Sequence, residues 1–271
     1  MPRIERPDGI ELHWEERGEG PPVVLLSYWN IVPAALEPIT GELSVDHRVI
    51  RYDDRGAGES TRQGPYDLDT AAADLQAVVE ETSDEPVVLL GTGDGPHRGV
   101  RVAAQRPDLV EAVVCVGGPP VGRDLFGDAE AMAASDVVVN ALLDMAETDY
   151  RTALRSVVTA GNPQMTEDEI RARVDIQGEH ADPEVSLARL RAWIESDSTA
   201  HSRALGDRLW VLHAEGFGGG WFPSGRDLEE LVDTVLPKAH LEEIDDGMVS
   251  RPDQAAAVVR RITSRIRAAR S

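Results

Sequence analysis

The stretch Val87-Val-Leu-Leu-Gly-Thr-Gly-Asp-Gly95 joins an apolar run to a glycine-rich turn. The run Pro86–Leu90 is short and is bounded by Pro and Gly, which is typical of a strand buried on both faces. The next residues, Gly95–Gln105, predict a helix, and Leu109–Val116 is a second apolar run. This order of strand, turn, helix and strand predicts a β-α-β unit with parallel strands.

The same alternation continues on both sides of this unit. The hydrophobic pattern predicts strands at Ile10–Glu16, Pro22–Ser27, Arg48–Tyr52, Leu209–His213 and Ala239–Ile244. It predicts helices at Leu68–Glu81, Gly225–Val235 and Pro252–Ala269. Strands that alternate with helices at this spacing indicate an α/β fold, a doubly wound and mostly parallel sheet covered on both faces.

Residues 119–205 have a different pattern, with helical runs and no run typical of a strand. The runs are Ala129–Ala146, Tyr150–Val158, Glu167–Val174 and Pro183–Glu195. We therefore expect a core formed by residues 1–118 and 206–271, with residues 119–205 as an inserted helical cap or lid. Ligands of such sheets bind at the carboxyl ends of the strands, which places the pocket between sheet and lid.

Composition excludes several classes of partner. The 271 residues carry 49 acidic side chains against 27 basic ones, a formal charge of −22, which argues against binding to nucleic acid or an anionic membrane. No apolar run approaches the roughly 18 residues of a transmembrane helix. The first residues lack the apolar segment of a secretory signal, so we expect a cytoplasmic protein. The single cysteine, Cys115, excludes an intrachain disulfide.

Four segments resemble the α/β-hydrolase fold family. Gly18–Leu26 is similar to the entry into the family's third strand, and Tyr52-Asp-Asp-Arg-Gly-Ala-Gly-Glu-Ser60 to its YDxRGxGxS loop. Val87–Gly95 resembles the strand that leads into the nucleophile elbow, and Arg106–Val110 the helix-to-strand step after it. The resemblance implies the α/β-hydrolase fold with a lid, in agreement with the hydrophobic pattern.

The resemblance fails where the family's chemistry resides. The family places its nucleophile at the centre of G-x-S-x-G, and here the centre of Gly91-Thr-Gly-Asp-Gly95 is Gly93. Met248 stands at the position of the family's histidine and Phe217 at that of its acid. The resemblance therefore implies a member without a working catalytic triad. Glycine adopts the strained elbow conformation freely, so we expect Gly93 to keep the elbow and to open space at the pocket floor.

Asp94 and His97 are the candidates for acid–base chemistry. Asp94 follows the elbow, where it could be a general base or simply an acid favoured by the positive end of a helix. His97 lies three residues further along the same helix, so the two side chains could hydrogen-bond. The alternative for His97 is a partly exposed surface histidine.

Other residues near the elbow are candidates for binding. Tyr28, Trp29 and Asn30 follow the third strand and offer an aromatic wall with hydrogen-bonding groups; the alternative is packing between sheet and lid. Thr92, Gly93, Phe217 and Met248 complete the expected pocket, although Thr92 could equally pack at the strand end. Seven scattered histidines without metal-binding spacing, and no phosphate loop, predict neither a metal nor a cofactor.

Three hypotheses on function remain open. The first is an enzyme that binds a small, largely apolar molecule and promotes non-covalent acid–base chemistry, such as isomerisation, cyclisation or elimination, through Asp94 with His97 or Tyr28. The second is a pseudoenzyme or scaffold that binds a ligand without chemistry. The third is an ordinary esterase, which the residue at position 93 disfavours. The sequence leaves open whether the protein is a monomer or a homodimer.

Overall fold

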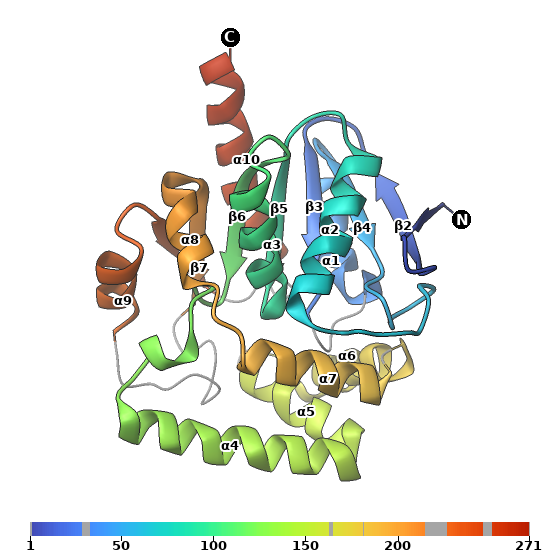
Figure 1. Cartoon of the computed structure of the whole chain (residues 1–271), viewed down its shortest axis with the longest axis vertical. Coiled ribbons are helices and arrows are strands. Elements are labelled where there is room, and N and C mark those ends of the chain that lie inside the picture. The colour runs from blue at the N-terminus through green and yellow to red at the C-terminus, as the bar shows by residue number, and fades with distance from the viewer. Residues whose placement is uncertain are drawn as a thin grey trace.

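The computed structural model describes residues 2–28, 33–162, 165–180, 182–214, 227–245 and 251–270. Within these ranges the centre of the molecule is an eight-stranded sheet of order β1-β2-β4-β3-β5-β6-β7-β8 (Figure 1). The strands are β1 (Arg3–Glu5), β2 (Glu11–Arg17), β3 (Pro22–Leu26), β4 (Arg48–Tyr52), β5 (Val87–Thr92), β6 (Val110–Val116), β7 (Leu209–His213) and β8 (His240–Glu243). The pairs β1–β2 and β2–β4 are antiparallel, and the other pairs are parallel.

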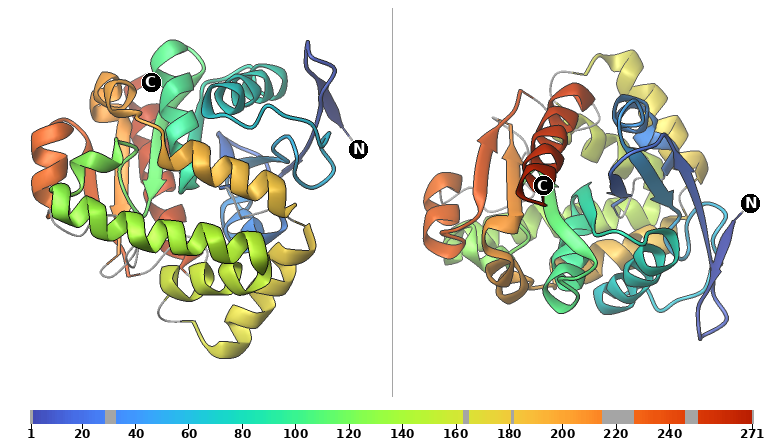
Figure 2. Two further views of the ribbon diagram at one scale, coloured as in Figure 1. Left: turned by 60° about the horizontal axis from the view of Figure 1, so that its bottom comes forward. Right: turned by 90° about the horizontal axis from the view of Figure 1, so that it is seen from above.

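Helices cover both faces of the sheet (Figures 1 and 2). On one face pack α1 (Glu37–Leu43) and α10 (Pro252–Arg270). On the other face pack α2 (Leu68–Thr82), α3 (Asp94–Gln105), α8 (Thr199–Leu205) and α9 (Leu228–Val235). Successive residues of a strand point to opposite faces, so Val24 and Leu26 join the second layer while Val23 and Leu25 join the first. Burial on both sides explains why the strands are almost wholly apolar.

Four further helices lie across the edge of the sheet at which the parallel strands end (Figure 1). They are α4 (Ala129–Thr148), α5 (Tyr150–Gly161), α6 (Glu167–His180) and α7 (Pro183–Ile194). Aspartates begin three of them: Asp128, Asp149 and Asp182 each accept hydrogen bonds from backbone amides of the first turn. Such caps satisfy amides that have no partner within the helix, so the acidic residues locally fix where these helices start.

The chain leaves the core for these helices and returns to it at one place. The Gly122 amide donates to Thr199 Oγ1 at 3.0 Å, and Ser202 Oγ donates to the Pro120 carbonyl at 2.6 Å. The outgoing segment after β6 is thus tied to α8, the helix that leads back into the sheet at β7.

The predicted fold class is confirmed, with differences at element ends. Strand β5 continues to Thr92, two residues beyond the predicted end, and α9 begins at Leu228 rather than Gly225 because Asp227 caps it. The short elements β1, α1 and α8 were not predicted from the pattern. Among the described residues no helix is both long and apolar enough to cross a membrane.

Candidate functional site

The turn between β5 and α3 has the sharp geometry expected of an elbow. Thr92 is buried at the end of β5, and α3 begins at Asp94. Gly93, between them, has φ +60° and ψ −127°, a conformation open to glycine but costly for other residues. The turn lies at the carboxyl edge of the sheet, where parallel α/β folds bind ligands.

Tyr28 occupies the space next to Gly93. A Cβ atom added at Gly93 would lie 2.9 Å from the Tyr28 Cβ and 3.1 Å from its Cγ, closer than real contacts allow. The expectation that Gly93 opens space at the pocket floor is therefore wrong, because an aromatic side chain already fills it. Burial raises the pKa of the Tyr28 phenol, which consequently stays a neutral hydrogen-bond donor.

Asp94 is buried, with 3% of its surface exposed, and is held between two arginines. One of its carboxylate oxygens accepts from Arg98 Nη1 at 3.1 Å and from Arg189 Nη2 at 2.9 Å. Arg98 is on the same helix, one turn away, whereas Arg189 reaches in from α7. A carboxylate with two buried guanidinium partners is typical of a structural ion pair.

Asp54, the second aspartate of the YDxRGxGxS loop, completes a buried cluster of four charges. Its Oδ2 lies 3.1 Å from both Arg98 Nη2 and Arg189 Nη2, and it accepts from Ser27 Oγ at 2.5 Å. Burial alone would raise the pKa of Asp54, but Arg189 and Arg98 outweigh it and hold that pKa below the usual range. The two carboxylates and two guanidiniums balance, so α7 is fastened electrostatically to the core.

His97, three residues after Asp94 on α3, has other partners. Its Nδ1 is 3.2 Å from Ser198 Oγ and 3.4 Å from Ser196 Oγ, and its ring meets Trp193 edge-on at 6.3 Å. Burial, followed by the charge of Arg101, lowers the pKa of His97 to about 3, so the imidazole is neutral. With only 5% of its surface exposed, His97 is not the surface histidine of the alternative prediction.

The predicted dyad is thus not assembled in the expected way: Asp94 is directed to arginines and His97 to serines. Beside His97 lies a cavity of about 20 Å³, room for one water-sized molecule. Its lining residues are His97, Val121, Arg123, Val139, Leu190, Trp193, Ile194 and Ser196.

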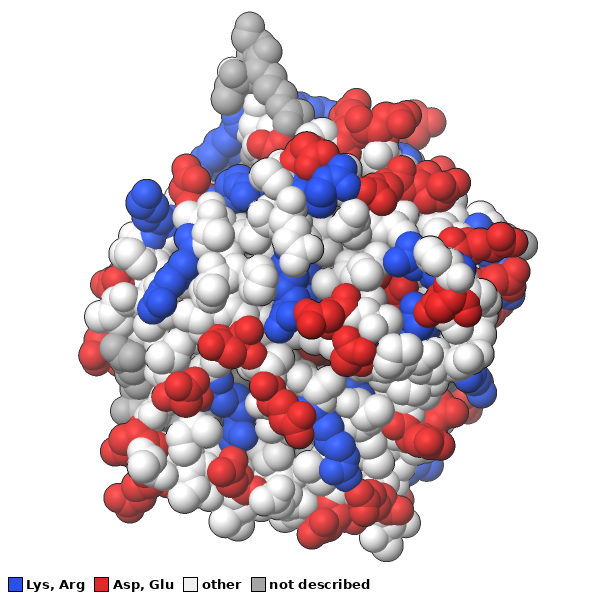
Figure 3. All heavy atoms as spheres, viewed as in Figure 1, with Lys and Arg blue, Asp and Glu red and all other residues white. Residues whose placement is uncertain are grey.

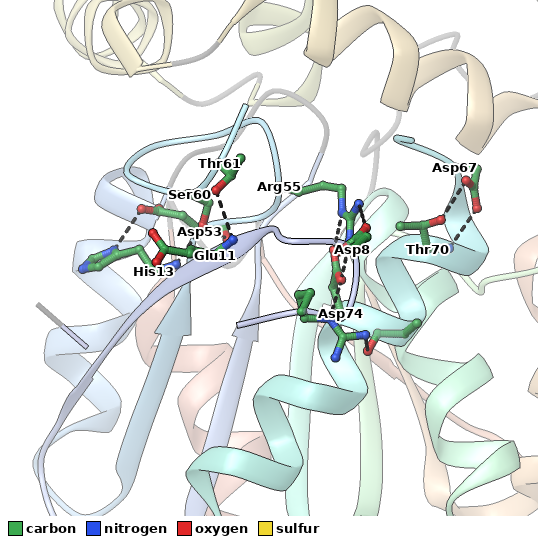
Figure 4. Close-up of polar contacts among 12 residues, drawn as sticks. Asp8, Glu11, His13, Asp53, Arg55, Ser60, Thr61, Asp67, Thr70 and Asp74 are labelled. Carbon is green, nitrogen blue, oxygen red and sulfur yellow. Dashed lines mark hydrogen bonds and ion pairs between the residues drawn. The ribbon is translucent and has the colours of Figure 1, made fainter. Parts of the chain in front are cut away.

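The loop Tyr52–Ser60 is braced from both sides (Figure 4). Asp53 Oδ2 pairs with His13 Nδ1 at 3.0 Å, and Ser60 Oγ donates to the Asp53 carbonyl at 2.6 Å. Arg55 Nε donates to Asp74 Oδ2 at 2.6 Å, which ties the loop to α2. These bonds fix the segment that delivers Asp54 to the charge cluster.

Several sequence candidates fall elsewhere. Trp29, Asn30, Phe217 and Met248 lie outside the described residues. The sequence analysis missed Asp54, Arg98 and Arg189. The i, i+4 spacing of Asp94 and Arg98 was a usable signal for one pair; nothing in the sequence linked Arg189 to Asp94, 95 residues earlier.

Comparison with known proteins places this geometry in context. The family model described as alpha/beta hydrolase fold matches residues 20–172. A 2-(acetamidomethylene)succinate hydrolase of Mesorhizobium japonicum is 28% identical over 61% of this chain and 58% of its own length. A pimeloyl-[acyl-carrier protein] methyl ester esterase of Aliivibrio salmonicida is 32% identical over 40% of each chain. The matches therefore span about half the length of these curated relatives.

Solved structures agree over almost the full chain. A bromoperoxidase from Bacillus anthracis superposes with a TM-score of 0.80 at 21% identity, covering 94% of this chain and 96% of its own. An esterase from Exiguobacterium antarcticum gives 0.81 at 19% identity, covering 96% and 98%. At such identities the likeness establishes the fold but not the activity, which has to be argued from the residues of the site.

Proposed function

Because the chain belongs to the α/β-hydrolase fold family, we propose that it binds a small, largely apolar molecule at the carboxyl edge of the sheet and does not hydrolyse it through a serine nucleophile. In this proposal residues 119–205 form the lid of the pocket, and residues 1–118 and 206–271 form its core.

The observation that carries the proposal is the elbow itself. Members of the family place their nucleophile at the centre of the turn between this strand and helix. Gly93 stands there with φ +60°, and Tyr28 fills the volume that a side chain at position 93 would need. Covalent catalysis requires an attacking group, and glycine has none.

The names of the relatives favour the hydrolase alternative, since they describe a succinate-derivative hydrolase and a methyl ester esterase. Hydrolysis of an ester by covalent catalysis needs an attacking group, and position 93 supplies no side chain for it. The family match therefore supports the pocket more strongly than it supports hydrolysis.

Acid–base catalysis by Asp94 is also disfavoured. A general base must be free to accept a proton from the substrate. Asp94 instead holds Arg98 and Arg189 at 3.1 Å and 2.9 Å, and protonating it would leave buried guanidiniums with less compensation. These contacts favour binding without chemistry over the enzyme hypothesis that ranked first from the sequence.

Labelling with a fluorophosphonate probe tests the proposal. The wild-type protein should take up no label and should not turn over p-nitrophenyl esters above background. Mass spectrometry of the native protein, purified without denaturation, should find a co-purifying small molecule. Stoichiometric labelling of a serine would contradict the proposal, and an established serine hydrolase of this fold serves as the positive control.

A further inference from the structure

Helix α6 carries an inward cation without a carboxylate partner among the described residues. Exposed arginines of the lid have acidic partners: Arg151 pairs with Asp175, Arg155 with Glu167, Arg171 with Asp168 and Arg191 with Glu147. Arg173, on the same helix as Arg171, is half-buried, and in the described part of the chain it forms no ion pair. Burial lowers the pKa of its guanidinium, and the Tyr28 phenol is the neighbour that opposes this.

One turn further along α6, Gln177 is wholly buried and unsatisfied. It has 0% of its surface exposed, and neither its Nε2 nor its Oε1 has a hydrogen-bond partner. A buried amide without partners costs free energy, and native structures rarely keep one without a reason. The i, i+4 spacing places Gln177 on the same face of α6 as Arg173.

Arg173, on this face, lies near the residue that covers the elbow. Tyr28 covers Gly93, and its pKa is affected by the charges of both Arg173 and Asp94. Helix α6 also contacts the segment Pro33–Leu36, which follows β3 on the way to α1. Arg173 and Gln177 therefore lie where the lid meets the carboxyl edge of the sheet.

We propose that Arg173, Gln177 and Tyr28 bind the carboxylate end of the ligand, a small acid that carries an amide next to its carboxylate and is otherwise largely apolar. The inference rests on the proposed function and names its ligand class. The guanidinium fork matches a carboxylate, the glutamine side chain both donates and accepts, and the phenol donates. The protein has a net charge of −22, and its acidic and basic side chains intersperse over the face in Figure 3. A half-buried arginine that has no carboxylate partner among the described residues is the feature that would select an anion.

N-Acetylglycine and its neutral counterpart N-acetylglycinamide test the site. N-Acetylglycine should raise the melting temperature of the wild-type protein in a concentration-dependent way, at constant ionic strength, and the amide should not. Arg173→Gln should weaken binding of N-acetylglycine by at least about tenfold, because a charge-assisted hydrogen bond is lost. Arg171→Gln, which removes an exposed arginine of the same helix, is the control and should bind as the wild type does.

The ligand-free proteins provide a second readout. Arg173→Met should melt at a higher temperature than the wild type, since it removes a desolvated cation that the described residues leave unpaired. A purely structural Arg173 would give the opposite shift. Equal stabilisation by the acid and the amide, or unchanged binding by Arg173→Gln, would overturn the carboxylate site and leave the proposed function standing. Fluorophosphonate labelling would instead overturn the proposed function alone.

Discussion

Two separate constraints keep a side chain out of position 93. The φ of +60° at Gly93 disfavours any side chain on conformational grounds, and Tyr28 excludes one sterically. The first constraint was predictable from the sequence, because the glycine-rich turn follows a strand at the place of the family's elbow. The second was not, because Tyr28 is distant along the chain and is placed by packing against two buried clusters.

Substitution at Gly93 separates the two constraints. Gly93→Ala should destabilise the protein by the strain cost of about 1–3 kcal/mol, with a further cost for displacing Tyr28. In a Tyr28→Gly background the same substitution should cost less, because the contact at 2.9 Å is gone. Urea unfolding of the four proteins gives the coupling free energy. Equal costs in both backgrounds would show that Tyr28 does not cover position 93.

Asp94 can be tested as an ion-pair partner against its predicted role as a base. Asp94→Asn should lower the free energy of unfolding by about 3–5 kcal/mol, since it leaves Arg98 and Arg189 with Asp54 as their one carboxylate partner among the described residues. A base without a structural role would leave stability almost unchanged. The pair Asp69–Arg101, whose aspartate is exposed, supplies the control, and Asp69→Asn should cost less than about 1 kcal/mol.

At the scale of elements, apolar runs predicted the sheet well. Strand β4 matches its predicted range, and β6 differs by a single residue. In β6 five consecutive buried apolar residues leave little choice of structure. Elements too short to show a period, such as β1 and α1, escaped detection. The site depended on contacts between α3, α7 and the loop before α2, and no local pattern encodes such contacts.

Helix α7 is held on the core by Arg189, so replacement of Arg189 should loosen α7 selectively. Arg189→Met should speed amide hydrogen exchange in α7 and leave the central strands β5 and β6 protected, because α7 then loses its ion pairs with Asp54 and Asp94. Arg191→Met is the matched control: Arg191 is on the same helix but is exposed and pairs with Glu147. Uniform acceleration across the sheet would mean that the cluster stabilises the whole fold rather than the lid.

At the scale of the whole molecule, the charge cluster and His97 make stability depend on pH. The folded-state pKa of His97, about 3, lies below its ordinary value of about 6.5. Between these pH values His97 is protonated in the unfolded chain and neutral in the folded protein. The free energy of unfolding therefore falls as the pH is lowered from about 6.5 toward about 3. The lowered pKa of Asp54 acts in the same direction at the acid end of this range.

Replacing His97 isolates its share of this dependence. His97→Gln should flatten the loss of stability between about pH 6.5 and pH 4.5, relative to the wild type, because one titrating group is removed. The comparison needs urea midpoints for both proteins across that range. A slope that is the same in both would show that His97 is solvated enough to titrate normally in the folded state.

The hydrogen bond from Gly122 to Thr199 closes the intervening chain into a loop. Everything between these residues starts and finishes at one hydrogen-bonded point of the core. The entropy of closing a loop grows only slowly with its length, by about 0.6 kcal/mol per doubling. Replacing this loop by a shorter or longer segment would therefore change the free-energy cost of closing the chain very little. Other segments could be grafted onto the same sheet at this junction.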